Sequence, residues 1–513
     1  MAHGSSRGDR LSNDVDYRDL ALQSEAEVEA IRARVAQSPL YNEDLAPAGP
    51  ARRTWSTWNI LAMWLGMSVV ITTYTLASGL MAAGMNWWQA LLTVGLGNII
   101  VLVPMLLNAH VGVRYGIPFP VFVRSSFGIH GANVAALARA IVGCGWFGIQ
   151  TWLGGLAISG ILGELSGAWG ALPGHDFVAF FIFWLIQMAI ILRGMEAIKR
   201  FESWAAPLLI LVGVWLLAWG FSAGGGVGHV FRASSAMTGA AKHGFWALFW
   251  PGLAANVGYW ATLSLNIPDF TRFARSQRSQ VVGQIIGLPV TMIVYSFIGI
   301  AVTAATVVVF GKAVWNPVDL VPMVTHNPFV LVIAMLLIVV AQISTNMAAN
   351  VVAPSNDFSN VAPKLISFRT GGVITGIIGV LMFPWALFNN AGAYIFTWLG
   401  GYGSLLGAVA GIMIADYWLV RRRNLQLQDL YEYGGAYARW NAIAFVALAL
   451  AVVPVIPGFI HAAATPGGVV DHPDFLDRLY TYGWFFTFCV SIVSYWVLST
   501  LWQPQASAAS AQG

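Results

Sequence analysis

A cluster of amide and hydroxyl side chains interrupts one of the most apolar segments of the chain. Residues 341–350 read AQISTNMAAN, within PFVLVIAMLLIVVAQISTNMAANVVAP, and five of these ten residues are polar. At helical spacing, Ala341, Ser344 and Thr345 share one face. The Ala341 carbonyl and the two hydroxyls are neutral hard oxygens, which suit a small hard cation such as Na⁺ when carbonyls from an unwound neighbour complete the shell. Such residues can also join helices by hydrogen bonds, but so dense a cluster favours a cation site.

A second set of residues has the properties of a binding site for a planar, uncharged ring. Asn346 and Asn350 lie four residues apart on another face of the same segment, and each amide offers the donor and acceptor that a heterocyclic amide or ureide requires. In GCGWFGIQTWLGG, Trp146 and Gln150 have the same spacing and place an indole beside an amide. Trp260 could supply a second stacking surface. Most of the 23 tryptophans must serve in packing or interfacial belts, but Trp146 lies about halfway through a long apolar segment, which argues against a belt position.

Ionisable side chains are sparse at the centres of the apolar segments. Asp269 and Asp416 fall near segment ends and Glu164 falls at a loop edge, and we find no Asp, Glu or His near a segment centre. Because proton relays usually use such groups, the pattern favours coupling to Na⁺, with proton coupling through Asp269 or Glu164 as the alternative. It also argues against a charged substrate. Arg139 is the one basic residue within a segment, and we expect it to snorkel or pair near the cytoplasmic end.

The elements that must position these residues are membrane-spanning helices. The 513 residues are 58% hydrophobic and 9% charged, against roughly 25% charged residues in soluble domains. Because a spanning helix needs about 20 residues, the apolar runs predict an all-α polytopic membrane protein. Twelve transmembrane segments fit, at about 57–83, 87–109, 131–163, 177–193, 203–222, 244–266, 281–310, 328–353, 371–388, 391–419, 441–461 and 481–502.

The distribution of Lys and Arg predicts the orientation. With the N-terminus in the cytoplasm, 21 of the 26 basic residues fall on the cytoplasmic side, four fall on the other side and Arg139 lies within a segment. This bias follows the positive-inside rule and predicts cytoplasmic N- and C-termini. Since the basic residues lie in short loops, the net charge of +4 does not indicate nucleic-acid binding. Residues 1–55 are polar and show no secretory signal, so we expect a cytoplasmic tail with one short helix.

Two of the twelve segments have features of broken helices. In the first, Gly66 precedes the β-branched run 69–73, which has poor helix propensity. In the sixth, Pro251, Gly252 and Gly258 lie near mid-depth, where we expect unwinding. The tripeptides WLG and WPG stand early in these segments, five segments apart, so the two copies have opposite orientations. Isolated Gly and Pro also occur in ordinary membrane helices, but an inverted repeat would place a ligand site at the midplane between the breaks.

Several longer motifs resemble one transporter family. YNEDLAP followed by RTWSTWN, YGIPFPVFVRSSFG, GWFGIQTWLGG, NIPDFTRF and the 341–350 stretch are similar to the nucleobase–cation symporter-1 family, which includes hydantoin, allantoin, uracil and cytosine permeases. The resemblance covers roughly residues 40–500. It implies a LeuT-type arrangement of ten core helices in two inverted repeats of five, plus two peripheral helices. We therefore expect a cytoplasmic tail at 1–55, repeats at 56–222 and 223–420, peripheral helices at 421–503 and a disordered tail at 504–513.

The resemblance also implies roles for the residues singled out above. Trp146 and Trp260 would sandwich the substrate ring. Gln150 and Asn350 would hydrogen-bond its amide edges, with Asn346 in support. For the sodium-coupled hydantoin carrier of the family, the cation ligands correspond to the Ala341 carbonyl, Ser344, Thr345 and backbone carbonyls near Gly66 and Val69.

Two residues of the first segment depart from the pattern of that hydantoin carrier. Val70 stands where the carrier has a polar amide that contacts substrate, and Thr72 replaces a proline common in relatives. The eighth-segment cation pattern is intact, which supports Na⁺. The departures leave the substrate open among uracil, allantoin and hydantoin.

The combined pattern predicts a carrier and not an enzyme. We expect a secondary active symporter that imports a small planar nucleobase or cyclic ureide with Na⁺, which would bridge the first and eighth helices before one bundle rocks against the other. Proton-coupled uptake and a passive channel are the alternatives. At mid-membrane we find no carboxylate pair, metal-ligand cluster or nucleophile–base set, and we find no nucleotide-binding loop, so we expect no organic cofactor. The sequence favours a bacterial inner membrane and leaves the oligomeric state open.

Overall fold

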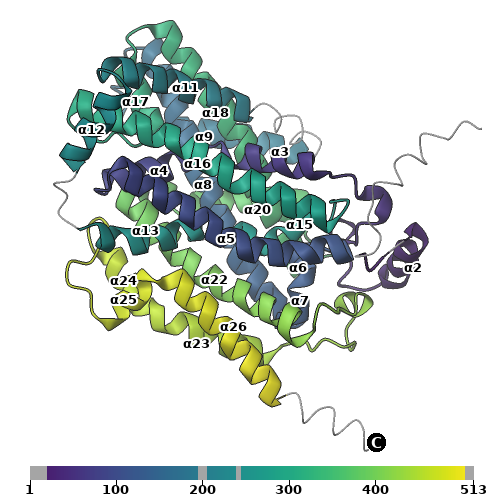
Figure 1. Cartoon of the computed structure of the whole chain (residues 1–513). Helices are drawn as coiled ribbons and strands as arrows, with labels where there is room; N and C mark the ends of the chain where they lie inside the picture. The colour runs from purple at the N-terminus through teal and green to yellow at the C-terminus, as the bar shows by residue number, and fades with distance from the viewer. Residues whose placement is uncertain (1–19, 23, 194–204, 239–243, 503–513) are drawn as a thin grey trace, which may run out of the picture.

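The computed structural model describes residues 20–22, 24–193, 205–238 and 244–502 (Figure 1). These residues form helices, and the only strand-like pairing among them is an isolated bridge between Trp55 and Ala274. The disordered tail expected at 504–513 lies outside the described residues. The longer elements are α2 (Glu25–Val35), α3 (Thr57–Ser68), α4 (Ile71–Ala82), α5 (Trp87–Tyr115), α8 (Ala132–Leu165), α9 (His175–Arg193), α11 (Ala205–Ala223), α12 (Val227–Thr238), α13 (Phe245–Tyr259), α16 (Gln277–Phe310), α17 (Pro317–Val324), α18 (Pro328–Asn350), α19 (Val352–Val361), α20 (Phe368–Leu381), α22 (Gly400–Ile414), α23 (Ala442–Val452), α24 (Ile456–Ala464) and α26 (Gly483–Trp502). The shorter ones are α6 (Phe119–Phe122), α7 (Arg124–Phe127), α14 (Ala261–Asn266), α15 (Pro268–Thr271), α21 (Pro384–Leu387), α25 (Phe475–Thr481) and the π-helices η4 (Ala393–Leu399) and η5 (Ala415–Val420).

The first span is broken where the sequence predicts. α3 ends at Ser68 and α4 begins at Ile71, and the two helices meet at an angle of 57°. Val69 and Val70 between them have ψ angles of 79° and 156°, outside the helical region. β-branched residues fit such extended backbone better than they fit a helix. The expected break is therefore confirmed.

The sixth span is broken at a different residue from the one expected. α13 runs through Pro251 and Gly258 without interruption, and the helical path is lost only at Trp260, with φ −100° and ψ 8°, before α14 begins. Membrane helices tolerate an internal proline. Gly258 serves close packing, because a Cβ there would lie 2.6 Å from the carbonyl oxygen of Leu399. The prediction of unwinding around Pro251 is therefore wrong. Pro and Gly lower the local helix propensity, but here the packing of the helix decides where it breaks.

The described helices include eight that are long and apolar enough to cross a membrane, or ten if each of two bent pairs counts as one span. The bent pairs are α3 with α4 and α11 with α12. The other two expected spans, 244–266 and 371–388, correspond to α13 with α14 and to α20, which is a shorter apolar helix. These elements are consistent with twelve crossings.

The eighth span extends further than the sequence suggests. After Val351 the chain continues as α19, and the candidate span covers 328–361 and not 328–353. The extension carries Asp357, which is fully buried beside Arg139. A hydropathy profile places the end of a helix near a charged residue. Here the ion pair with Arg139 allows the carboxylate to stay inside the protein. Local hydropathy therefore gives no sign of this buried acid.

The helices form a core with a more exposed flank. α8 packs against α18, α19 and α20, and α16 packs against α3, α4 and α5. In the 442–464 and 483–502 spans only 28% of the most apolar window is buried, against 78% for 393–420. Figure 1 shows α23 and α26 on one side of the molecule. Their low burial matches the peripheral position expected for the last two spans.

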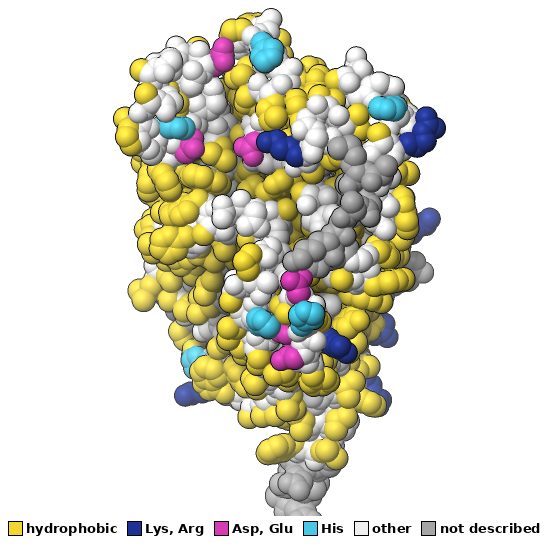
Figure 2. Space-filling model, turned by 90° about the vertical axis from the view of Figure 1, so that its left-hand side faces the viewer, with side chains coloured by type: hydrophobic (Ala, Val, Ile, Leu, Met, Phe, Trp, Pro, Cys, Tyr) yellow, Lys and Arg dark blue, Asp and Glu magenta, His cyan; other side chains and the backbone are white. Residues whose placement is uncertain are grey.

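The two ends of the helix bundle lie on opposite sides of the molecule in Figure 1. α2, α6 and α7 lie at one end in Figure 1, and α12, α24 and α25 lie at the other. Figure 2 turns the latter end toward the viewer, and it shows acidic and His side chains gathered among hydrophobic ones. Hydrophobic side chains cover much of the flanks, as a lipid-facing surface requires.

Residues 20–55 pack against the end that carries α6 and α7. The Ala48 N–H donates to the Gly116 carbonyl at 2.8 Å, and the Asn42 amide donates to the Pro363 carbonyl at 3.0 Å. Arg124 lies buried below this segment and donates to the Leu430 carbonyl at 2.8 Å. Burial lowers the pKa of Arg124 to about 10, so the guanidinium stays charged at neutral pH. The segment predicted as a tail is therefore joined to several loops of the membrane domain.

Candidate substrate and cation site

A small cavity lies where the two broken spans approach α8 and α18. Its lining residues come from the first-span break, from α8, from the sixth-span break and from α18. The cavity has a volume of about 30 Å³. Because one water needs roughly 10–15 Å³ of such space, the cavity holds a few waters at most. The lining residues are Met67, Val70, Thr72, Trp146, Gln150, Tyr259, Trp260, Thr262, Leu263, Thr345, Ala349 and Asn350.

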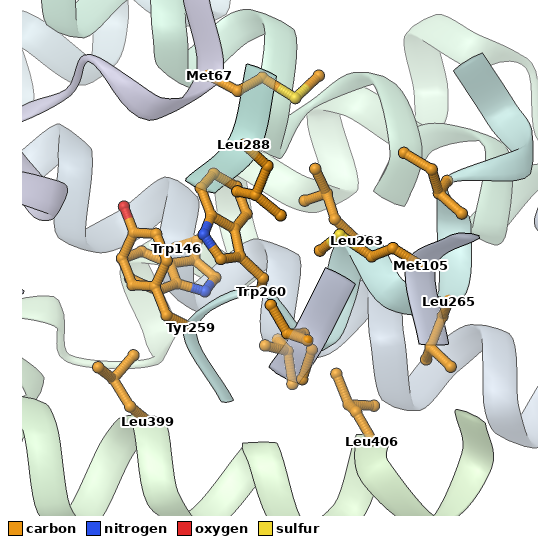
Figure 3. Packing of buried hydrophobic residues seen from close by; sticks show 14 of the residues in the cluster. Met67, Met105, Trp146, Tyr259, Trp260, Leu263, Leu265, Leu288, Leu399 and Leu406 are labelled. Carbon is orange, nitrogen blue, oxygen red and sulfur yellow. The ribbon is translucent and has the colours of Figure 1, made fainter. Parts of the chain in front are cut away.

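Trp146 stands in the middle of an aromatic group. It is buried on α8, and its indole N–H donates to the Tyr402 hydroxyl at 3.1 Å. Tyr259 and Tyr394 pack edge-on against it, with ring centroids 5.2 and 6.1 Å away. Figure 3 shows Tyr259 beside Trp146. Since the indole N–H already has a partner, the orientation of the ring is fixed. The structure thus places Trp146 at the cavity, as its proposed role requires.

Trp260 is the residue at which the sixth span breaks, and it is fixed in a similar way. Its indole N–H donates to the Asn98 side-chain oxygen at 2.8 Å. The Asn98 amide in turn donates to the Val94 carbonyl of its own helix, α5, at 2.8 Å. Trp64 packs edge-on against Trp260 at 5.2 Å. The helix break and the α5 contact together turn this indole toward the cavity.

The amide side chains divide into two that line the cavity and one that supports them. Gln150 and Asn350 line it, and the Gln150 side-chain oxygen is buried without a hydrogen-bond partner among the described residues. Asn346 does not line it. The Asn346 amide donates to Gln187 at 2.7 Å and to the Phe147 carbonyl at 3.1 Å, and its oxygen accepts from Asn350 at 2.9 Å. Asn346 therefore orients Asn350 through a hydrogen bond. The side-chain oxygen of Gln150 is the acceptor that lacks a partner among the described residues.

The first-span break frees the two backbone carbonyls expected to hold a cation. In a continuous helix, the N–H of Val70 would donate to Gly66 and that of Thr73 to Val69. Here the Val70 N–H donates to Ser68 at 3.0 Å, and the Thr73 N–H donates to Val70 at 3.1 Å. The carbonyls of Gly66 and Val69 thus lose their helical donors and can accept another ligand.

Thr345 supplies the complementary group from α18. It lines the same cavity as Met67 and Val70 of the first span, and its buried hydroxyl has no hydrogen-bond partner among the described residues. Leaving such a group unsatisfied costs about 1–3 kcal/mol. Ala341 and Ser344 are buried on the same helix. Neither of these two residues lines the cavity. The Thr345 hydroxyl is a neutral hard oxygen, of the kind that a small hard cation takes as a ligand.

Three residues of the site were not predicted from the sequence. They are Asn98, Tyr259 and Tyr402, and each reaches the site from a different helix. Tyr394, Trp398 and Tyr402 repeat at helical spacing, so this aromatic stripe could have been found from the sequence. Asn98 and Tyr259 carry no such signal.

Arg139 does not snorkel to the surface. Its guanidinium lies 3.6 Å from the Asp357 carboxylate, and both side chains are buried. Neither carboxylate oxygen of Asp357 has a hydrogen-bond partner among the described residues. The pairing expected for Arg139 is confirmed, although its acidic partner was not foreseen.

Comparison with known proteins shows the family to which this chain belongs. The model of a family described as permeases for cytosine/purines, uracil, thiamine and allantoin matches residues 47–486. The chain belongs to this family, the nucleobase–cation symporter-1 family. It is 41% identical to the purine-uracil permease NCS1 of Arabidopsis thaliana, over 92% of this chain and 80% of the relative. It is 38% identical to the allantoin permease of Bacillus subtilis, over 91% and 95% of the two chains.

A solved structure of the same family shares the architecture. Mhp1, a nucleobase-cation-symport-1 family transporter in a closed conformation with bromovinylhydantoin bound, is 26% identical. The TM-score is 0.72, and the match covers 90% of this chain and 97% of Mhp1. The similarity confirms the expected all-α membrane fold of LeuT type. The relatives are permeases, in keeping with a transporter and not an enzyme.

Proposed function

We propose that this permease imports a small planar nucleobase or cyclic ureide together with Na⁺ by alternating access. The observation that carries the proposal is the single cavity bordered by both kinds of group. Trp146, Trp260, Gln150 and Asn350 offer stacking faces and amides, and Thr345 stands opposite the first-span break. Uracil, allantoin and hydantoin all combine a planar ring with adjacent N–H and C=O groups, which these amides complement. The names of the relatives support this substrate class.

In this proposal Na⁺ binding and substrate binding are coupled because Thr345 lines the same cavity as the ring-binding residues. Thr345 on α18 and the freed carbonyls of α3 would hold Na⁺ between two elements that move relative to each other. Binding there favours the conformation in which the first-span break and α18 are close, which is also the one that completes the ring site. Na⁺ shifts the conformational equilibrium only as far as it binds the two conformations unequally. We assign the N-terminal side to the cytoplasm on the strength of the positive-inside bias. A bacterial inner membrane is the location that the sequence favours.

Proton coupling is a second candidate, and Asp357 is the observation that favours it. This buried carboxylate lies inside a membrane span and its oxygens lack hydrogen-bond donors among the described residues. Buried intramembrane acids often carry protons in transporters. Against this, Asp357 does not line the cavity, whereas Thr345 does. We therefore favour Na⁺.

Uptake of radiolabelled uracil, allantoin and hydantoin into proteoliposomes tests the proposal. We expect uptake of at least one ring that rises with an inward Na⁺ gradient and is lost in Trp146→Ala. Uptake driven by a pH gradient and indifferent to Na⁺ would favour the proton-coupled alternative. Counterflow exchange in preloaded vesicles separates a carrier from a passive channel, because only a carrier shows it. Failure to take up any ring under either gradient would contradict the substrate assignment.

A further inference from the structure

Tyr259 packs against both tryptophans of the proposed ring site. It is the last residue of α13 and is 5% exposed. Its ring meets Trp146 edge-on at 5.2 Å and Trp260 edge-on at 4.9 Å. Figure 3 shows the three rings side by side above the ribbon of α22. A phenol ring therefore already packs against both of the indoles on which a substrate ring would stack.

The hydroxyl of Tyr259 is tied to the other broken helix. It lies 2.9 Å from the Thr72 hydroxyl and 3.1 Å from the Thr73 hydroxyl, at the start of α4. Its backbone carbonyl accepts from the Tyr402 hydroxyl at 3.4 Å. Thr72 is one of the two residues at which the first segment departs from the hydantoin-carrier pattern, and a proline there could not bind the phenol. The hydroxyl and the backbone carbonyl of Tyr259 thus connect α13 to both α4 and α22.

The size of the cavity shows what the tethered ring does. With Tyr259 in place the cavity admits only a few waters. A substrate ring can stack on either indole only if the phenol turns away or shifts. The phenol is a planar six-membered ring with one polar substituent, and so it is close in size to a single pyrimidine or hydantoin ring. Its displacement frees room for one such ring and leaves little for a bulky substituent.

We propose that Tyr259 is the specificity-determining residue of this site and restricts it to single rings without an aryl substituent. The inference rests on the proposed function and narrows its substrate class. An unsubstituted ring replaces the phenol, and its amide groups take over the partners that the phenol loses at Thr72 and Thr73. An aryl group on the ring meets the displaced phenol and is excluded.

Two variants separate the size of the phenol from its tether. Tyr259→Ala removes the ring, and Tyr259→Phe keeps the ring and removes only the hydroxyl. The measurement is binding of hydantoin and of hydantoin with an aryl group on C5 to the purified full-length protein at saturating Na⁺, followed by tryptophan fluorescence.

We expect the wild type to bind the unsubstituted ring and to discriminate against the aryl derivative. Tyr259→Ala should bind the aryl derivative at least about tenfold more tightly than the wild type does, in the range that a hydrophobic pocket achieves for small size differences. Tyr259→Phe should bind the unsubstituted ring roughly three- to tenfold more tightly, because the ring no longer has to displace the hydrogen bonds of the phenol hydroxyl. It should still exclude the aryl derivative.

Several results would overturn the inference. One is a Tyr259→Ala protein that excludes the aryl derivative as strongly as the wild type does. Another is a wild type that binds both compounds equally. If Tyr259→Ala does not fold, an unchanged ring affinity in Tyr259→Phe would by itself refute the tether. Binding of uracil, allantoin and hydantoin to none of the proteins would reject the proposed function itself, and this inference with it.

Discussion

At the scale of single residues, the site combines fixed rings with unfilled polar atoms. The indole N–H groups of Trp146 and Trp260 are satisfied by Tyr402 and Asn98, so both rings are held before any ligand arrives. The side-chain oxygens of Gln150 and Thr345 are buried at the cavity without partners among the described residues. Preorganised rings reduce the entropy lost on binding, and the unfilled atoms are satisfied only by ligands. Two predictions distinguish the role of the Thr345 hydroxyl from that of the Gln150 side-chain oxygen.

Thr345→Ala should weaken Na⁺ binding while the ring site stays intact. The variant loses one hard oxygen, and an interaction with a charged group is worth about 1.5–3 kcal/mol, or roughly a tenfold or greater loss of apparent Na⁺ affinity. Ring uptake as a function of Na⁺ concentration measures this. Thr345→Ser keeps the hydroxyl and serves as the matched control. An unchanged Na⁺ dependence in Thr345→Ala would show that this hydroxyl holds no cation.

Gln150→Ala should have the opposite pattern. Loss of the amide removes hydrogen bonds to the ring, so we expect ring affinity to fall roughly tenfold at saturating Na⁺. The Na⁺ concentration for half-maximal stabilisation of the ligand-free protein should stay within about twofold of wild type. Binding titrations with hydantoin or uracil, together with Na⁺-dependent thermal shifts, give both values. Equal loss of both would mean that Gln150 shapes the fold more than it binds the ring.

At the scale of elements, the breaks of the first and sixth spans are positioned by close helix contacts. α13 crosses α22 where Gly258 and Gly403 meet, and a Cβ on Gly403 would lie 2.8 Å from the Gly258 Cα. This crossing fixes the end of α13 directly before Trp260. Elsewhere in the bundle, the pair formed by Arg139 and Asp357 joins α8 to α19. Each contact can be tested by a substitution that leaves the cavity residues unchanged.

Gly258→Ala should destabilise the protein by about 1–3 kcal/mol, the usual cost of overpacking. The added methyl group would lie 2.6 Å from the Leu399 carbonyl oxygen, so α13 and α22 must separate. Gly163→Ala is the matched control, because its added methyl group would meet only Trp169, at 3.9 Å. Thermal unfolding in detergent compares the two. Equal melting temperatures would show that the crossing is not tightly packed.

Asp357→Ala should be more damaging, since it leaves the Arg139 guanidinium buried without its partner. Removing one member of a buried ion pair costs about 3–5 kcal/mol. The double variant Arg139→Met with Asp357→Leu should recover most of that loss, because no unpaired charge remains. Thermal unfolding again provides the comparison. A double variant as unstable as Asp357→Ala would indicate that packing, and not the buried charge, causes the loss.

At the scale of the whole molecule, much of the fold follows from the bilayer. Apolar runs of spanning length and the placement of Lys and Arg predict the helices, because lipid imposes both the length and the sidedness. The predictions were wrong where tertiary contacts override local signals. Pro251 does not break α13, and Asp357 does not end the eighth span.

The site was predictable to the extent that its residues share a helix. Pairs four residues apart, such as Trp146 with Gln150 and Asn346 with Asn350, lie on one face, and helical periodicity reveals them. Asn98 and Tyr259 act through residues more than one hundred positions away in the chain. No local pattern records such contacts, and only the packed structure brings them together.

The most direct test of the account is the affinity of the purified protein for its ring measured across a range of Na⁺ concentrations. If Na⁺ and the ring bind at one cavity in one conformation, their binding is coupled, and each ligand must raise the affinity of the other by the same factor. We predict that ring affinity rises with Na⁺ in the wild type and that Thr345→Ala flattens the dependence. A ring affinity that does not change with Na⁺ concentration but changes with pH would contradict the cation site. It would indicate that transport is coupled to a proton.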